Sequence, residues 1–308
     1  MDLLKRFQQE EQARTYRRLD QSYKVNIYLG YNESGQMSLV VAEQGKIVPV
    51  KSTKEIQVLL SPRNDGKVAL SFNLLNMSSK QIFLELCRDL IQACEIAGPK
   101  KAIPAAIERW KLWLSMFSKK SNRLLEVNTM KGLIGELSLL SDFFIPKYGE
   151  TAAVHSWMGP MLGHKDFEVE DTWYEVKSCS ENALKIEISS LLQLDADAPG
   201  HLVVSRLEKT NKAYDGAVCL NSAVEETEAL LSDPEVLELF RFKLRNAGYQ
   251  YDPEYENYYF RRAGRSFYRV DDHFPALRRS IVEPVICEAK YSILLLGLEK
   301  FKEGQDDC

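Results

Sequence analysis

The stretch of sequence that most restricts the fold is HKDFEVEDTWYEVKSCS, residues 164–180. Apolar and polar side chains alternate on both sides of Glu170-Asp171, a pattern that predicts two strands joined by a two-residue turn. Because the side chains of a strand point alternately to opposite faces, the turn also predicts which residues lie opposite one another. The predicted pairs are Val169 with Thr172 and Phe167 with Tyr174.

The register of this hairpin decides what its charged residues can do. With Glu170-Asp171 as the turn, Asp166 lies opposite Glu175, where like charges destabilise the pairing unless a cation lies between them. Carboxylate oxygens suit Mg²⁺ or Mn²⁺, and Lys177 beside such an ion could hold a phosphate oxygen or assist an attacking water. If the turn lies one residue later, Asp166 faces Lys177 in an ordinary salt bridge. A solvated acidic hairpin is the third interpretation.

A helix that precedes the hairpin carries another carboxylate. The segment GLIGELSLL, residues 132–140, is mostly apolar but contains Glu136. Glycine costs about 1 kcal/mol relative to alanine inside a helix, so Gly132 and Gly135 suggest a close approach of helix to sheet. Such an approach would direct Glu136 toward the sheet. A surface glutamate beside fortuitous glycines is the alternative.

The order of these residues resembles the PD-(D/E)XK nuclease signature, a helical acid followed by Asp and then Glu-x-Lys. The predicted order αβββαβ over residues 123–207 resembles the core of type II restriction enzymes and Holliday-junction resolvases. The chain is most similar to a family of bacterial PD-(D/E)XK-motif proteins of unknown function. The matching segments are GLIGEL (132–137), Trp157-Met158-Gly159-Pro160, Asp166-Phe167, Glu175-Val176-Lys177 and SSLLQL (189–194). Lys165 departs from the pattern, because other members of the superfamily carry at this position the proline that gives the superfamily its name.

The resemblance implies a metal-dependent endonuclease that hydrolyses DNA in bacterial defence against foreign DNA. The implied ligands of Mg²⁺ or Mn²⁺ are Asp166, Glu175, the Val176 backbone carbonyl and Glu136. Lys177 would orient water and stabilise charge on the phosphorane, and Gln193 would position the phosphate. The implied partners are DNA and other proteins of a defence gene cluster, and a homodimer is left open. The alternative is a catalytically inactive nuclease-fold subunit that binds DNA or proteins within a defence complex.

The overall charge argues against a protein that coats nucleic acid with its whole surface. The chain has 40 Lys and Arg against 44 Asp and Glu, a net charge of −4, so contact with a polyanion requires a local basic patch. Arginines that neutralise phosphates and aromatic rings that stack on bases could form one within residues 257–270, and a second basic stretch spans residues 99–123. The candidate residues are Arg261, Arg262, Arg265, Arg269, Lys119 and Lys120. A solvated face with core aromatics is the alternative.

Composition and apolar runs indicate a folded cytoplasmic protein. Hydrophobic residues make up 45% of the chain, yet the longest unbroken apolar run is Ile293–Leu296, far below the about 20 residues that span a membrane. The start of the sequence lacks the apolar region of a signal peptide. The six cysteines are dispersed, which is typical of reduced thiols. A zinc site from His155, His164 and Cys179 has no recognised ligand spacing.

The predicted fold class is mixed, α+β or α/β, in three regions. Residues 1–120 form a β-rich and helical region, in which a helix over 1–20 precedes hairpins that turn at 32–35 and 63–66. Residues 121–215 form the nuclease-like core, which includes a predicted strand at 152–157. Residues 216–308 form a helix and strand extension that packs on the core. A helix over 223–247, either continuous or broken at Pro234, and a pairing of the strands SFYRV and ICEAKYSILLLGL are expected there.

Overall fold

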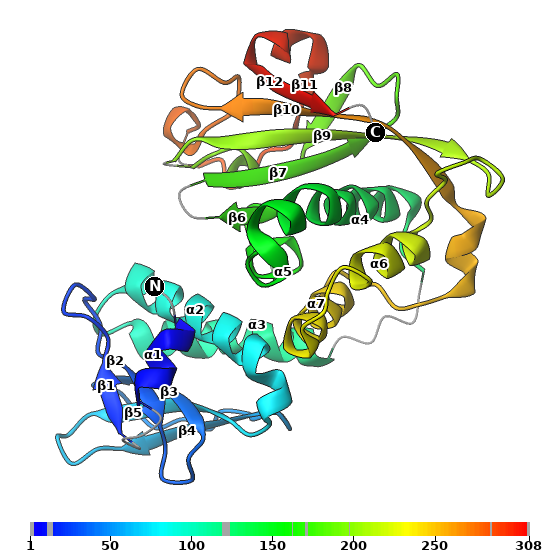
Figure 1. The fold of residues 1–308 in the computed structure, drawn as a ribbon. Coiled ribbons are helices and arrows are strands. Elements are labelled where there is room, and N and C mark those ends of the chain that lie inside the picture. The colour runs from blue at the N-terminus through cyan, green and yellow to red at the C-terminus, as the bar shows by residue number, and fades with distance from the viewer. Residues whose placement is uncertain are drawn as a thin grey trace. The chain divides into compact units, whose positions relative to one another are not determined.

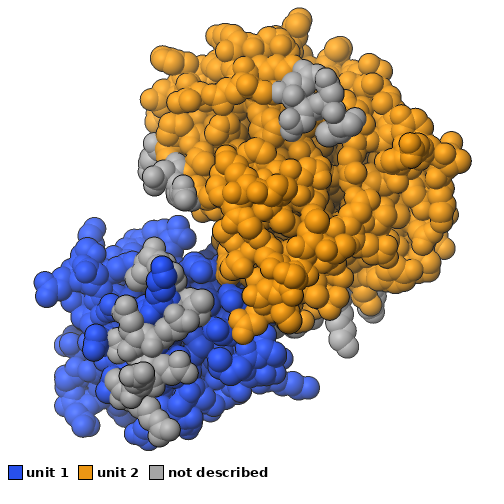
Figure 2. Space-filling view, viewed as in Figure 1, with its two compact units in different colours: residues 1–119 blue, residues 120–308 orange. Residues whose placement is uncertain are grey.

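The computed structural model describes residues 3–10, 15–118, 124–161, 163–169, 172–196, 198–283 and 285–306. The chain divides into two compact units, residues 1–119 and 120–308, which Figure 1 draws as a ribbon and Figure 2 distinguishes by colour. Residues 216–308, expected as an extension of the core, lie within the second unit.

An antiparallel sheet forms the β part of the first unit, with the strand order β1-β2-β3-β5-β4. Its strands are β1 (Tyr16–Arg18), β2 (Ile27–Tyr31), β3 (Met37–Glu43), β4 (Ile56–Pro62) and β5 (Val68–Leu74). Both predicted hairpins are confirmed, and Gly35 and Gly66 adopt positive φ angles of 73° and 77° at their turns. Glycine reaches this region without the steric cost of a Cβ.

The helices of the first unit are α1 (Leu3–Glu10), α2 (Lys80–Ala97) and α3 (Ala102–Ser118). Trp110 of α3 is fully buried, and its ring lies 5.7 Å from that of Phe72 on β5. The helix predicted over residues 1–20 is too long, because α1 ends at Glu10 and residues 16–18 pair with β2. A 3₁₀ turn, Met77–Ser79, precedes α2 and is capped by Asn76.

A mixed sheet of five strands organises the second unit, in the order β12-β10-β9-β7-β6. The strands are β6 (Phe167–Val169), β7 (Thr172–Cys179), β9 (Gly200–Thr210), β10 (Tyr259–Val270) and β12 (Lys302–Asp306). Strands β7 and β9 are parallel, and the other neighbours are antiparallel. The remaining strands, β8 (Lys185–Ile188) and β11 (Tyr291–Leu294), pair with each other in a separate small sheet.

Helices and the small sheet lie on opposite sides of this mixed sheet (Figure 1). The helices are α4 (Val127–Leu139), α5 (Ile145–Ser156), α6 (Leu220–Glu228) and α7 (Pro234–Asn246), and a π-helical turn (Leu140–Phe144) joins α4 to α5. Helix α4 contacts β7 and β9, while α6 packs on α4 and α7 packs on α5. On the other side, Leu202 and Val204 of β9 share a buried cluster with Ile186 and Ile293 of the small sheet.

The mixed α/β class is confirmed, but several predicted details are wrong. Of residues 152–157, predicted as a strand, 152–156 belong to α5, since the segment TAAVHS carries two alanines, which favour helix. Trp157 forms an isolated antiparallel bridge with Phe167. The predicted pairing of the strands near 267 and 293 does not form, because β10 pairs with β9 and β12 while β11 pairs with β8. Strand β8 therefore lies outside the expected core sheet. The helix expected to follow β8 is a single 3₁₀ turn, Leu191–Gln193.

Candidate active site

One half of the candidate site lies on the face of β7 that carries Trp173. Trp173 belongs to the cluster under the small sheet, and alternation along the strand places Glu175 and Lys177 on that face. Lys177 Nζ lies 2.8 Å from Glu175 Oε1 and donates a hydrogen bond of 3.0 Å to Gln193 Oε1. Gln193 Oε1 also accepts the N–H of Ser189 at 2.7 Å. Lys177 therefore links the buried Glu175 to the turn that follows β8.

The other half lies on the helix side of the sheet, at a cavity of about 330 Å³. Glu136 of α4 lines this cavity and accepts the indole N–H of Trp157 through Oε2 at 2.7 Å. A Cβ built on Gly159 would lie 3.2 Å from the same oxygen and 3.0 Å from Asp166 Oδ1. The absence of a side chain at Gly159 therefore leaves open space against both carboxylates. The other lining residues are Thr129, Gly132, Leu133, Pro160, Asn246 and Ala247.

Asp166 joins the two halves at the edge of β7. It stands directly before β6, and its Oδ2 accepts the Val176 N–H at 2.7 Å. The N–H and C=O groups of one strand residue point to the same side, so the Val176 carbonyl faces this edge as well.

The predicted hairpin register is confirmed, since Phe167 pairs with Tyr174 and Val169 with Thr172. The interpretation that set Asp166 against Lys177 is therefore wrong. The turn residues 170 and 171 lie outside the described residues.

The carboxyl groups of the site oppose one another's ionisation. Desolvation, followed by the charge of Asp166, raises the pKa of Glu175 to about 8 despite the adjacent Lys177. Desolvation and the Asp166 charge also raise the pKa of Glu136 well above its ordinary value. Desolvation raises the pKa of Asp166, although the Val176 N–H and Lys177 act in the opposite direction. A positive charge bound between these carboxyl groups would relieve their repulsion.

The donor set suits a hard divalent cation. Carboxylate and carbonyl oxygens are its preferred ligands, and the space at Gly159 lies between two of them. Among the described residues, however, no three His, Cys, Asp or Glu side chains are grouped to hold a metal ion, which also applies to the zinc set considered above. Glu136 and Asp166 converge, whereas Glu175 is turned to Lys177 on the opposite face.

The glycines of α4 differ in role. A Cβ on Gly135 would lie only 2.1 Å from Ser178 Oγ of β7, so this position requires glycine for the close helix–sheet contact that the sequence predicted. A Cβ on Gly132 would meet nothing within 4 Å, because this residue faces the cavity. The prediction of close packing is therefore correct for Gly135 and wrong for Gly132.

The arginines proposed for nucleic-acid contact make ion pairs within the second unit. Arg261 pairs with Glu181, Arg262 with Glu226, and Arg269 with Glu303. Arg265 is 3% exposed and pairs with Asp142, so its side chain is not presented to solvent. Arg269 is the most exposed of the four, at 54%. Lys119 and Lys120 lie outside the described residues.

Sequence reasoning missed three residues that surround the site. Lys165 is buried, its Nζ donates to the carbonyls of Leu192 at 2.6 Å and Asp195 at 3.1 Å, and it lies 3.9 Å from the Trp173 ring centroid. The residue that replaces the superfamily's proline thus holds the turn that carries Gln193. The other two are Lys243 and Asn246 of α7. A lysine within an apolar helical stripe was the available signal.

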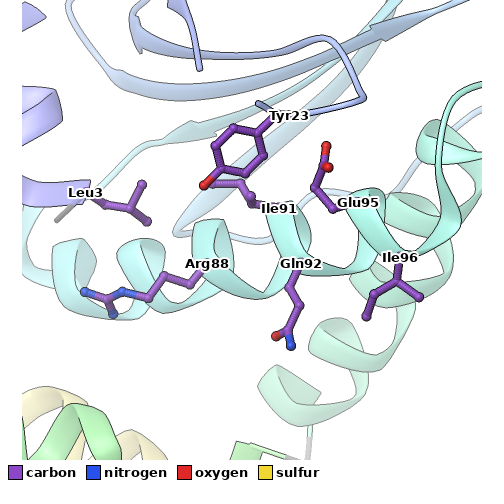
Figure 3. A pocket seen from close by; sticks show the side chains of 7 residues that line it. All are labelled: Leu3, Tyr23, Arg88, Ile91, Gln92, Glu95 and Ile96. Atoms are coloured by element: carbon purple, nitrogen blue, oxygen red, sulfur yellow. The ribbon is translucent and has the colours of Figure 1, made fainter. Parts of the chain in front are cut away.

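A second cavity, of about 360 Å³, lies in the first unit (Figure 3). It is lined by Leu3, Tyr23, Arg88, Ile91, Gln92, Glu95 and Ile96. Glu95 accepts the backbone N–H groups of Lys24 and Val25, each at 3.1 Å. This carboxylate is thus used to fasten the segment before β2.

The fold is of the mixed α/β class and is consistent with a PD-(D/E)XK nuclease-like fold. The chain belongs to the family described as "Putative PD-(D/E)XK family member, (DUF4420)", whose model matches residues 3–295. No curated protein and no solved structure matches the chain. Among the described residues, no helix combines the length and apolar character needed to cross a bilayer.

Proposed function

We propose that the protein is a Mg²⁺- or Mn²⁺-dependent phosphodiesterase that cleaves DNA. The observation that carries the proposal is the placement of Asp166, Glu175 and Lys177 along the β6–β7 hairpin, where Asp166 accepts the Val176 N–H and Lys177 pairs with Glu175. The three residues follow one another in the order typical of PD-(D/E)XK enzymes. Perturbed carboxyl groups of this kind cluster at catalytic sites. Glu136, which lines the adjoining cavity, adds a further acidic group.

Each residue has a role that its position supports. A bound divalent cation would supply Lewis-acid stabilisation of charge on the phosphate. Asp166, Glu136, Glu175 and the Val176 carbonyl are the proposed ligands. Lys177, held by Gln193 at 3.0 Å, orients the attacking water and stabilises the charge that builds on phosphorus-bound oxygen.

The Glu175–Lys177 pair sets a condition for this role. Oε1 of Glu175 lies 2.8 Å from Lys177 Nζ, so Glu175 becomes available as a ligand when the ammonium turns toward phosphate or water. Lys177→Met should therefore abolish cleavage while it leaves cation binding intact or tighter. Loss of both properties would show that Lys177 is needed to hold Glu175 in place.

The test measures cleavage of single- and double-stranded DNA by the purified chain with Mn²⁺ and with EDTA. Asp166→Ala and Lys177→Ala should each lower the rate at least about a hundredfold. Glu168→Ala is the matched control, because this exposed residue lies only two positions from Asp166. Cleavage that survives both site substitutions would contradict the assignment.

A second candidate function is a DNA-binding or protein-interaction subunit that keeps the nuclease fold without catalysis. It is favoured by the pairing of Glu175 with Lys177 and by the lack of a three-residue ligand group among the described residues. Under this function, no cleavage occurs even with partner proteins present, and DNA binding is unchanged by Asp166→Ala.

The family resemblance carries the proposed role in bacterial defence, beside proteins encoded nearby. Phage plating on cells that express the chain with its genomic neighbours tests it, with Asp166→Ala as the inactive form. Protection that is lost with this substitution supports a defence nuclease, whereas protection that persists favours the subunit. Sedimentation of the purified chain tests the proposed homodimer.

A further inference from the structure

A buried lysine on α7 stands in the apolar stripe of that helix. Lys243 is 0% exposed, as are Val236, Leu239 and Phe240, which precede it by seven, four and three residues. Positions with these spacings share one face of a helix. Because lysine is rarely buried completely unless it is paired, this side chain needs specific partners.

The partners are backbone carbonyls where α5 ends. Lys243 Nζ donates to the carbonyl oxygens of Val154 at 2.8 Å, His155 at 3.1 Å and Trp157 at 2.7 Å. The last carbonyls of a helix receive no N–H group from within the helix, and they form the negative end of its dipole. An ammonium group has three N–H donors, which matches these three oxygens. An apolar residue at this position would leave the carbonyls buried without these bonds.

The segment held by Lys243 contacts the carboxylate of Glu136 and the backbone of Asp166. The indole N–H of Trp157 donates to Glu136 Oε2 at 2.7 Å. The next two N–H groups, of Met158 and Gly159, donate to the backbone carbonyl of Asp166 at 2.7 and 3.1 Å. The position of this short segment therefore fixes where Glu136 and Asp166 stand relative to each other.

We propose that Lys243 is a positioning residue of the site: through Trp157 it sets the placement of Glu136 beside Asp166, and so the affinity for the divalent cation. This inference rests on the proposed function. It extends the site to α7, which lies outside the αβββαβ segment that carries the family signature. The competing explanation is that Lys243 merely fastens α7 to α5, and that the carboxylates keep their places without it.

The experiment compares Mn²⁺ binding by calorimetry in full-length variants, at a temperature where circular dichroism shows each to be folded. Lys243→Met should weaken Mn²⁺ binding about ten- to a hundredfold, the usual effect of losing a group that orients a ligand. Lys243→Arg, which keeps the charge, should restore much of the affinity. Leu244→Ala, at the next and also buried position of α7, should lower the melting temperature but bind Mn²⁺ like the wild type.

The indole N–H resonance of Trp157 gives a second readout that does not require metal. It should shift in Lys243→Met and stay in place in Leu244→Ala. Trp157→Phe should lose as much Mn²⁺ affinity as Lys243→Met, and the double variant should lose no more, since both act on one contact. Trp157→Phe also decides the matter if Lys243→Met does not fold: wild-type affinity in this variant would overturn the inference.

The outcomes separate this inference from the proposed function. If Lys243→Met binds Mn²⁺ as the Leu244→Ala control does, with an unmoved indole resonance, Lys243 is a structural clamp and the inference is wrong. If the wild type binds no Mn²⁺, the proposed function fails instead. The placement of Trp157 by Lys243 is then decided by the indole resonance alone.

Discussion

Two cavities, one in each unit, are lined by glutamates that are used in opposite ways. In the first unit, both oxygens of Glu95 accept backbone N–H groups, so its charge stabilises the chain around it. In the second unit, Glu136 receives one N–H from Trp157 but faces the like charge of Asp166. The carboxylate that lines the first cavity can be explained by folding alone. The carboxylates of the second cannot.

The difference supports the function proposed for the second cavity. Desolvation and neighbouring charge raise the pKa of both Glu136 and Glu175, which means that the fold keeps acids where their ionisation costs free energy. Proteins retain such destabilising groups where function requires them. The contrast can be tested by changing one cavity at a time.

The largest effect is expected at Gly159. Gly159→Val should weaken Mn²⁺ binding about a hundredfold, because a Cβ there lies 3.0 Å from Asp166 Oδ1 and 3.2 Å from Glu136 Oε2, and the two methyl groups fill the space beyond. Calorimetry measures the affinity. Gly132→Ala, on the same cavity but with nothing within 4 Å of its Cβ, is the control and should bind normally. Equal affinity in both variants would place the cation elsewhere.

The next effect is on stability and depends on pH. Glu136→Gln should raise the free energy of unfolding by about 1–3 kcal/mol at pH 8 without metal. The neutral amide still accepts the Trp157 N–H, but it carries no charge to repel that of Asp166. The folded-state pKa of Glu136 lies above its ordinary value of 4.5, so the folded wild type binds the extra proton and loses stability as pH rises above 4.5.

The sign of this dependence supplies the control. The advantage of Glu136→Gln should shrink as pH falls and be absent below pH 4.5, where the wild-type carboxyl is protonated in both states. Urea unfolding at several pH values measures it. With Mn²⁺ present, the wild type should gain more stability than the variant. A variant less stable than the wild type at pH 8 would show that Glu136 stabilises the fold.

The hairpin and its acids could be predicted from sequence because their information is local. Alternation about Glu170-Asp171 limited the hairpin to two registers, and the pairs of Phe167 with Tyr174 and Val169 with Thr172 confirm one of them. The helical Glu136 was found because it interrupts an apolar segment. Local spacing could not show that Glu175 and Glu136 approach from opposite faces, since this depends on where α4 packs.

The contacts that hold the site were not predictable for the same physical reason. The bond from Trp157 to Glu136 spans 21 residues, and the bond from Lys243 to Trp157 spans 86. The pairing of β8 with β11 joins residues about a hundred positions apart. Such contacts are chosen by packing among distant elements, and short-range patterns carry no record of them.

The two glycines of α4 lead to opposite predictions for the stability of the second unit. Gly135→Ala should destabilise the second unit by about 1–3 kcal/mol, because its Cβ would lie 2.1 Å from Ser178 Oγ and 3.4 Å from Ser205 Cβ. Gly132→Ala should stabilise it by up to about 1 kcal/mol through helix propensity alone. Thermal unfolding measures both. Destabilisation by both substitutions would mean that α4 packs more closely at the cavity than the structure shows.

The smallest effect completes the contrast, because it applies to Glu95 the change already made at Glu136. Glu95→Gln should destabilise the first unit by about 1 kcal/mol: the two oxygens receive the N–H groups of Lys24 and Val25, and a glutamine has only one oxygen to offer. Removal of a negative charge from the last turn of α2 offsets part of this loss, which keeps the effect small. Urea unfolding measures the change, and Mn²⁺ affinity should be unaltered.

The same substitution, glutamate to glutamine, would thus lower the stability of the first unit at Glu95 and raise that of the second unit at Glu136. If both variants were stabilised, the carboxylate of Glu95 would destabilise the fold as that of Glu136 does, and the contrast between the two cavities would be wrong.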